Sequence, residues 1–216
     1  MFLSKRFATA AIASALVLTS ASSFAVTIGF SQVGEEGDWR LAFSKDMHEE
    51  AKKEGIDLKF ANAHGKPEDQ LKAVRDFIAA KVDAIVIAPV VVTGWDDVLQ
   101  EARKAAIPIF LADRDVDVAD KSLYVTRIAA DFNLEGRIAG AWLAAASRGY
   151  CNIVELQGTA GSAPTIERKK GFETVIANFP NMKIVRSESG DFTTQFGKKA
   201  MEDIIKDTDG LNNICA

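Results

Sequence analysis

Histidine, cysteine and long apolar runs are scarce in this chain of 216 residues, which contains two histidines and two cysteines. The two cysteines are too far apart to have the ligand spacing of a structural zinc site. The histidines do not complete such a site, because His48 lies among charged residues of a predicted helix and His64 lies in a polar turn. Beyond the N-terminus, no run reaches the roughly 20 apolar residues that a membrane-spanning helix needs. We therefore expect no metal centre, and no membrane span in the mature chain.

The sequence motifs of several enzyme classes are also missing. No GxGxxG follows the first predicted strand, and the stretch "GTAGSA" is neither a GxSxG elbow nor a phosphate loop that ends in Gly-Lys-Ser/Thr. No Ser–His or Cys–His set suggests a nucleophile. A glycosidase needs two facing carboxylates of different pKa, which spacing alone does not indicate. The formal charge is −4, with no basic stripe, which argues against nucleic acid as a partner. We expect a protein that is not an enzyme and uses no cofactor.

The N-terminus has the pattern of an export signal. Lys5 and Arg6 precede an apolar, alanine-rich run over residues 7–18, and the small residues of "SSFA" form a cleavage site before residue 26. The apolar run is short for a membrane anchor, which is the alternative. We predict a signal peptide over residues 1–25, removed on export.

Short apolar runs alternate with amphipathic segments through the rest of the chain. Continuous apolar strands separated by helices indicate parallel sheets that are covered on both faces. We therefore predict an α/β protein with doubly wound parallel sheets. The expected strands cover residues 26–31, 56–61, 84–88, 107–113, 152–157, 183–188 and 212–216, and the expected helices lie between them, among them residues 39–54, 133–147 and 193–206.

An irregular stretch divides this pattern in two. We predict an N-terminal lobe over residues 26–129 and a partial C-terminal lobe over residues 130–216, joined near Ala129–Asp131. The last strand ends at Ala216 with no helix to cover its outer face. This predicts a C-terminally truncated chain with an incomplete second lobe, and the alternative is that a partner completes the sheet.

Ligands of open parallel sheets bind beyond the carboxyl ends of the strands, so the strand-to-helix loops are the candidate site. These loops offer carboxylates as acceptors, guanidinium groups as forked donors and one flat aromatic ring. This mixture suits a sugar, which has hydroxyl groups around its rim and C–H groups on its faces. The candidate residues are Glu36, Gly37, Asp38, Trp39, Arg40, Asp113, Arg114 and Arg168. Taken singly, Asp113 and Arg114 also fit a local salt bridge, and Trp39 also fits a core position.

The chain resembles periplasmic sugar-binding proteins of the ribose/galactose type, which are the substrate-binding components of ABC importers, and among them those that bind galactofuranose. The matching stretches are "TIGFSQVG", "DWR", "QLKAVRDFIAAKVDAIVIAPVVVTGW", "PIFLADRDVDVADKSLYVT", "CNIVELQGTAGSAPTIERKKGF" and "SESGDFTTQFGKKAME". They cover nearly the whole mature chain. The resemblance implies two type I periplasmic binding protein lobes that close on a galactofuranose-like monosaccharide.

The resemblance also assigns roles to individual residues. It implies that Glu36, Trp39 and Arg40 line the cleft together with Gly37 and Asp38, that Asp113 and Arg114 form an Asp-Arg pair, and that Arg168 contributes from the second lobe. Asp131 matches less well. Asp38 departs from the family pattern, in which a small residue often precedes the tryptophan, and it could pair with Arg40 or add an acceptor.

A disulfide between Cys151 and Cys215 follows from the same resemblance. In an exported protein two cysteines are expected to be oxidised, although two buried free thiols are the alternative.

The implied function is delivery of a monosaccharide to an ABC permease by a monomeric binding protein. Two other functions share this fold. One is presentation of the ligand to a chemoreceptor or sensor kinase. The other is the sensor domain of a lactose-repressor-type regulator, which would carry a DNA-binding segment where this chain has its predicted signal peptide.

Overall fold

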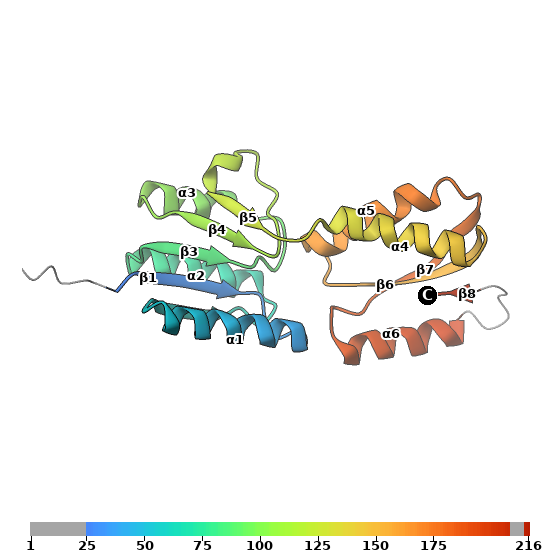
Figure 1. Cartoon of the computed structure of the whole chain (residues 1–216), viewed down its shortest axis with the longest axis horizontal. Coiled ribbons are helices and arrows are strands. Elements are labelled where there is room, and N and C mark those ends of the chain that lie inside the picture. The colour runs from blue at the N-terminus through green and yellow to red at the C-terminus, as the bar shows by residue number, and fades with distance from the viewer. Residues whose placement is uncertain (1–24, 208–213) are drawn as a thin grey trace, which may run out of the picture.

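The computed structural model describes residues 25–207 and 214–216, and these form two α/β lobes side by side along the long axis of the molecule (Figure 1). The predicted signal peptide, except Ala25, and the start of the last predicted strand lie outside these residues. The first lobe contains, in chain order, β1 (Thr27–Gln32), α1 (Asp38–Lys53), β2 (Asp57–Asn62), α2 (Pro67–Ala79), β3 (Ala84–Ile87), α3 (Asp96–Lys104), β4 (Ile109–Ala112), the 3-10 turn η1 (Lys121–Leu123) and β5 (Thr126–Ile128).

The second lobe contains α4 (Phe132–Ala146), β6 (Tyr150–Gln157), α5 (Ala163–Ile176), β7 (Asn181–Ser189), α6 (Thr194–Asp207) and β8 (Ile214–Cys215). The chain passes from the first sheet to the second between Ile128, the end of β5, and Phe132, the start of α4. No helix in the described part of the chain is both long and apolar enough to cross a bilayer.

Both sheets are parallel, as the buried apolar strands predict. The order is β2-β1-β3-β4-β5 in the first lobe and β7-β6-β8 in the second. In the first sheet the chain turns from β1 to β2 on one side and continues through β3 on the other, so β1 and β3 border the crevice where such sheets bind ligands. Helices α2 and α3 pack together on one face, while α1 lies on the opposite face (Figure 1).

The core of the first lobe lies between β3 and β4 and the two helices α2 and α3. Its largest fully buried side chains include Trp95, Ile85, Ile87, Leu99 and Leu111. A smaller core in the second lobe packs under α4 and α5. Two separate cores mean that each lobe is held by its own burial, which leaves the angle between the lobes free to respond to a ligand.

Helices α4 and α5 approach each other unusually closely because glycine lies at their crossing. A Cβ added at Gly136 would lie 2.0 Å from the carbonyl oxygen of Arg168, and one added at Gly171 would lie 2.0 Å from that of Asn133. A side chain at either position would force the two backbones apart. These glycines therefore set the position of Arg168 at the side of the second lobe that faces the first.

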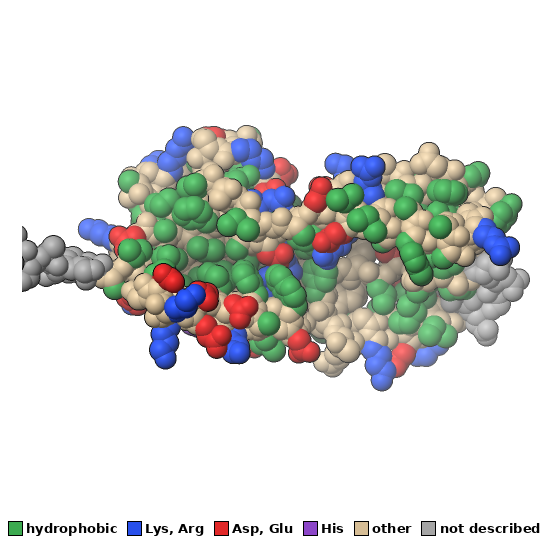
Figure 2. Space-filling view, in the orientation of Figure 1, with side chains coloured by type: hydrophobic (Ala, Val, Ile, Leu, Met, Phe, Trp, Pro, Cys, Tyr) green, Lys and Arg blue, Asp and Glu red, His purple; other side chains and the backbone are tan. Residues whose placement is uncertain are grey.

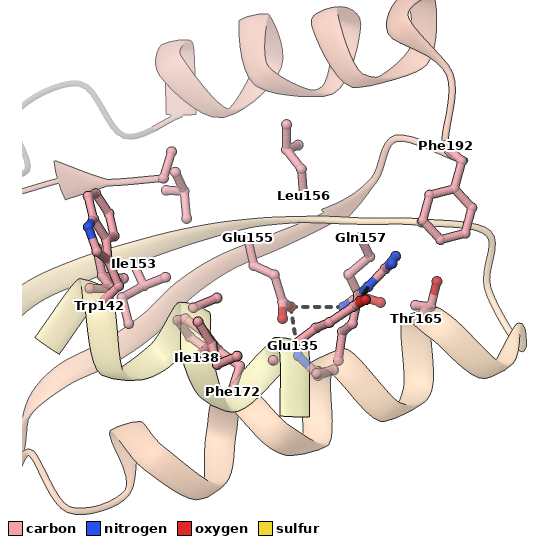
Figure 3. Close-up of a pocket in the computed structure, with 18 residues that line it drawn as sticks. Glu135, Ile138, Trp142, Ile153, Glu155, Leu156, Gln157, Thr165, Phe172 and Phe192 are labelled. Carbon is pink, nitrogen blue, oxygen red and sulfur yellow. Dashed lines mark hydrogen bonds and ion pairs between the residues drawn. The ribbon is translucent and has the colours of Figure 1, made fainter. Parts of the chain in front are cut away.

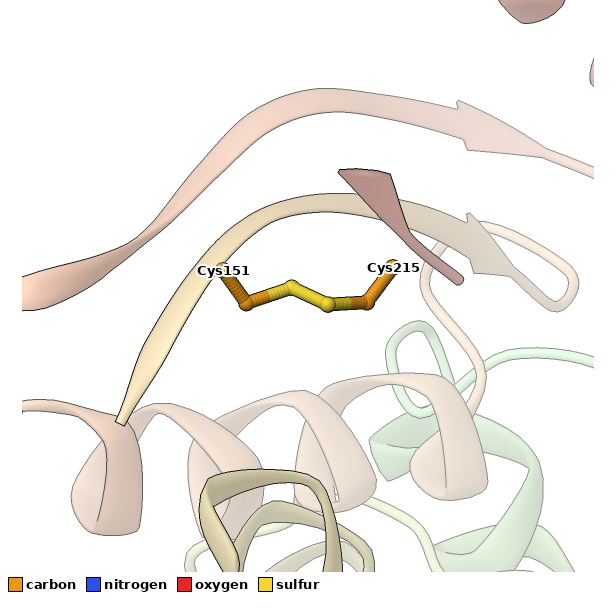
Figure 4. Close-up of a disulfide and its surroundings, with 2 residues drawn as sticks. All are labelled: Cys151 and Cys215. Atoms are coloured by element: carbon orange, nitrogen blue, oxygen red, sulfur yellow. A yellow bond between two sulfur atoms is a disulfide. The ribbon is translucent and has the colours of Figure 1, made fainter. Parts of the chain in front are cut away.

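The predicted disulfide joins Cys151 on β6 to Cys215 on β8, with their Cα atoms 6.1 Å apart (Figure 4). The two strands are neighbours, because Asn152 pairs with Ile214 and Ile153 with Cys215. The bridge thus secures the short strand β8 to the central strand of the second sheet.

Candidate functional site

Two arginines and two carboxylates form a closed charge network at the carboxyl ends of β1 and β4. Arg40 Nη2 donates to Asp113 Oδ2 at 2.7 Å, and Arg114 Nη2 donates to Glu36 Oε2 at 2.6 Å. The two diagonal contacts are longer, with Arg40 Nε 3.7 Å from Glu36 Oε2 and Arg114 Nε 3.8 Å from Asp113 Oδ2. The signs alternate around the network, so its formal charge is zero.

Local backbone geometry places these four side chains. Arg40 lies in the first turn of α1 and is 4% exposed, and Glu36 lies in the loop that connects β1 to that helix. Asp113 follows β4 directly and has a φ of 66°, a left-handed conformation that few residues other than glycine adopt.

The network is short of acceptors for its donors. Within the described residues, Arg40 Nε, Arg40 Nη1 and Arg114 Nε are buried and make no hydrogen bond. Burial lowers the pKa of the Arg114 guanidinium, and the negative charges of Glu36 and Asp113 oppose that shift. The group remains charged, since an arginine is not deprotonated in proteins. A ligand with oxygen acceptors would satisfy these donors, because an unpaired buried donor is costly.

The second lobe faces this network with an aromatic ring and a third arginine. Phe192 lies in the loop between β7 and α6, with its ring centre 5.2 Å from Arg114 Cζ. Arg168 on α5 donates from Nε to Glu135 Oε2 at 2.7 Å, and its guanidinium lies 4.8 Å from the ring centre of Phe132. The two lobes also meet directly, as Thr159 Oγ1 donates to Glu36 Oε1 at 3.4 Å.

A cavity of about 430 Å³ lies between these two walls. The volume is within the range of small-molecule sites. Figure 2 shows acidic and basic side chains next to one another where the lobes meet. The lining residues are Glu36, Gly37, Trp39, Arg40, Asp113, Arg114, Ala130, Phe132, Glu135, Pro164, Arg168 and Phe192.

Seven of the nine residues predicted for the site line this cavity, and the structure places the other two elsewhere. Asp38 is exposed at the first position of α1, and no pairing with Arg40 is found in the described structure. The Asp131 carboxylate caps α4 by accepting from the Leu134 N–H at 2.9 Å, and it lines a separate cavity. Trp39 is 63% exposed and stacks on Phe43, so it lies at the rim of the cleft and not in the core.

Sequence reasoning missed Phe192, Phe132 and Glu135. The motif "SGDFTT" contains Phe192 at a strand end, but only the pairing of β6 with β7 brings it to the cleft. Its ring covers Gly158, where an added Cβ would lie 2.0 Å from the ring. The sequence feature that could have indicated Phe192 is an aromatic residue in a polar turn directly after a predicted strand.

A larger cavity of about 800 Å³ lies on the second lobe between α4, α5 and β6 (Figure 3). Its wall is mostly apolar, with Ile138, Trp142 and Phe172 facing it. Its main polar group, Glu155, is already bonded to Lys169 at 2.7 Å and to Gln157 at 3.0 Å. With its polar groups paired to one another, this cavity offers a sugar few hydrogen bonds, and the cleft between the lobes is the better candidate.

Opposing effects act on the Glu155 carboxyl. Burial raises its pKa, but hydrogen bonds from Lys169, Ser187 and Gln157 outweigh burial and hold the pKa below its usual range. The pKa of Lys169 is raised, because its contacts with Glu155 and Glu173 outweigh the effect of burial.

The described residues contain no group of three or more His, Cys, Asp or Glu side chains that could hold a metal ion.

Comparisons with known proteins agree with this architecture. The model of the periplasmic binding protein domain matches residues 28–216. The galactofuranose-binding protein YtfQ of Escherichia coli (strain K12) is 52% identical over 212 residues, which cover 98% of this chain and 67% of the relative. A crystal structure of a galactofuranose-binding protein superposes with a TM-score of 0.85 and 55% identity, over 88% of this chain and 64% of the other.

A second solved structure is the binding protein of the arabinose ABC transporter of Shewanella sp. ANA-3, bound to α- and β-L-arabinofuranose. It has a TM-score of 0.81 and 56% identity, over 85% of this chain and 61% of the other. This chain thus spans about two thirds of the length of the relatives described. The match of the domain model over nearly all of the described chain shows that this protein belongs to the periplasmic binding protein family.

Proposed function

We propose that this protein is the periplasmic substrate-binding component of an ABC sugar importer, and that it binds a furanose-like monosaccharide between its two lobes. The observation that carries this proposal is the charge-neutral network of Arg40, Asp113, Arg114 and Glu36 that lines the cavity, in which three buried guanidinium N–H donors make no hydrogen bond. The relatives named above are described as binding galactofuranose and arabinofuranose.

The charge balance of the network favours a neutral ligand rich in hydroxyl groups. A phosphate or carboxylate would bring negative charge close to Glu36 and Asp113, and a cation would lie against the two arginines. A sugar hydroxyl donates to a carboxylate and accepts from a guanidinium at once, so adjacent groups of both signs suit it. Phe192 and Trp39 provide apolar faces for the C–H groups of the ring.

The same network argues for binding without chemistry. Each carboxylate is held by an arginine. The Thr159 hydroxyl donates to Glu36 only over a long 3.4 Å, and Arg114 already neutralises that carboxylate, which makes it a poor general base. Closure of the lobes about residues 129–131 would desolvate the sugar and bring Phe192 and Arg168 onto it. The closed form would then present its ligand to a membrane permease.

Isothermal titration calorimetry of the full-length protein with galactofuranose, arabinofuranose, galactopyranose and ribose tests this proposal. We expect heat of binding with at least one furanose, and no heat with any pentose or hexose would refute the sugar assignment. The location of the gene separates transport from sensing: neighbouring permease and ATPase genes favour import, and a neighbouring sensor kinase or chemoreceptor gene favours the alternative. We expect the 216-residue chain alone to bind weakly or not at all, and micromolar binding by it would contradict this expectation.

A further inference from the structure

Gln70 is a buried amide that makes only backbone contacts, and all of them lie at the crevice between β1 and β3. It lies on α2 and is 0% exposed. Its Nε2 donates to Ala88 O at 2.8 Å and, with a longer contact of 3.4 Å, to Ser31 O, and its Oε1 accepts from Val90 N at 2.8 Å. A buried amide with these partners is well satisfied, and its removal would leave backbone groups unpaired.

The Gln70 amide takes the place of a peptide group between two separating strands. The last ladder bond between β1 and β3 runs from Ala88 N to Ser31 O at 2.9 Å. Beyond this bond, Val33 N on the side of β1 donates to the side-chain oxygen Gln32 Oε1. On the side of β3, Ala88 O accepts from Gln70 and Val90 N donates to it. Because one side chain supplies both a donor and an acceptor, the strands can part here without an orphaned backbone group.

The loop that Gln70 holds touches both walls of the cleft. Val90 O accepts from Arg114 Nη1 at 3.5 Å, behind the charge network. Two residues further, Val92 N donates to Gly161 O of the second lobe at 2.9 Å. A second side chain braces the loop, since Trp95 Nε1 donates to Val91 O at 2.8 Å. The loop therefore connects the guanidinium that faces the ligand with the backbone of the opposite lobe.

We infer that Gln70 is a positioning residue of the binding cleft. Its amide opens the crevice between β1 and β3 and fixes the Val90–Gly94 loop, so that Val90 supports Arg114 and Val92 reaches Gly161. The support of Arg114 for ligand binding rests on the proposed function. The placement of Val92 against Gly161 of the second lobe does not. Gln70 itself touches no ligand, as it is buried behind the loop.

Amide hydrogen exchange measured by NMR on the whole chain tests the inference without any ligand. In Gln70→Met, which keeps the volume and removes the hydrogen bonds, we expect exchange at Val90 and Val92 to become about tenfold faster or more, relative to Ile85 in the sheet. The control is Val74→Ala, a fully buried position on the same helix. This variant lowers overall stability, and we expect it to leave the ratio of loop to sheet exchange unchanged.

A second variant keeps the test decisive if Gln70→Met does not fold. Gln70→Leu also removes both hydrogen bonds at a similar side-chain volume, so exchange at Val90 and Val92 should rise as it does in Gln70→Met. Wild-type protection of Val90 and Val92 in the folded variants would overturn the inference.

Titration of the full-length protein and its variants with a sugar tests the role of Gln70 in ligand binding. Affinity should fall about tenfold or more in Gln70→Met and remain unchanged in Val74→Ala. If affinity is unchanged while exchange at Val92 rises, the role in binding is refuted and only the contact between the lobes remains. If the wild type binds no sugar, the proposed function fails, and the exchange data still decide whether Gln70 holds the loop.

Discussion

Replacement of Arg114 by lysine separates the charge of this residue from its geometry. The guanidinium reaches Glu36 through Nη2 and Val90 O through Nη1, and its flat face lies against Phe192. A lysine keeps the positive charge, but its single ammonium group cannot make these contacts together. The substitution therefore removes the fork and the stacking while the network stays formally neutral.

The structure sets the size of the expected effect. The Arg114 side chain is 2% exposed and that of Glu36 is 15% exposed, so their hydrogen bond is poorly screened by solvent. A hydrogen bond to a charged group contributes about 1.5–3 kcal/mol. We expect Arg114→Lys to lower the free energy of unfolding by about 2 kcal/mol. Loss of a comparable contact with the sugar should weaken binding about thirtyfold.

Two further variants bracket this prediction. Arg114→Met also removes the charge and leaves two carboxylates with one arginine, and breaking a buried ion pair in this way costs about 3–5 kcal/mol. Arg75→Lys alters an exposed arginine that contacts Glu101 through both Nε and Nη2, so it makes the same chemical change at the surface. We expect little effect from it, because solvent screens exposed pairs.

Urea unfolding followed by tryptophan fluorescence measures stability, and calorimetric titration measures affinity. We expect the loss of stability and the loss of sugar affinity both to be smallest in Arg75→Lys, larger in Arg114→Lys and largest in Arg114→Met. If Arg114→Lys matches Arg75→Lys in stability and in sugar affinity, the buried, two-pronged hydrogen bonding of the Arg114 guanidinium contributes nothing measurable. That result would refute the account of the network.

Three further predictions concern the second lobe. Gly158→Ala should displace the Phe192 ring and weaken sugar binding at least tenfold, with little loss of stability, because an added Cβ would lie 2.0 Å from that ring; titration with unchanged affinity would contradict this. Glu155 has a lowered pKa in the folded state, so its stabilising effect should be complete above about pH 4.3 and decline as the pH falls through the lower folded value. In unfolding measurements from pH 7 to 3, Glu155→Gln should therefore reduce the acid sensitivity, and an identical pH profile would refute the assignment. Replacement of Cys151 and Cys215 by serine should lower the free energy of unfolding by about 4 kcal/mol on the chain-entropy model, since the bridge closes 64 residues, and a much smaller change in urea midpoint would show that the chain after β6 is held by other contacts.

Much of the fold follows from local patterns in the sequence. The apolar runs that became β1, β3 and β4 are buried or half-buried at every position, and β6 is so at six of its eight, as parallel sheets with covered faces require. The helix predicted over residues 39–54 is α1, Asp38–Lys53. Strand ends also indicate where a ligand would bind, and the structure brings Glu36, Arg40, Asp113 and Arg114, chosen by their positions after strands, to the wall of one cavity.

The remaining residues of the site depend on contacts between distant segments. Gln70 lies in "PEDQLK", where a polar residue predicts a solvated helix face, and only the separation of β1 from β3 reveals its role. Phe192 reaches the cleft because β7 lies beside β6. Arg168 is placed by the close crossing of α4 and α5, which depends on Gly136 and Gly171 fitting against the opposite backbone. No local pattern encodes these distances.

A crystal structure of the full-length protein soaked with a furanose sugar tests the central claim most directly. The account predicts one sugar between the lobes, with its hydroxyl oxygens within hydrogen-bond distance of Arg40 Nε or Nη1 and of Arg114 Nε, and with a ring face against Phe192. A sugar bound elsewhere on the molecule, or one in the cleft that touches neither arginine, would contradict it.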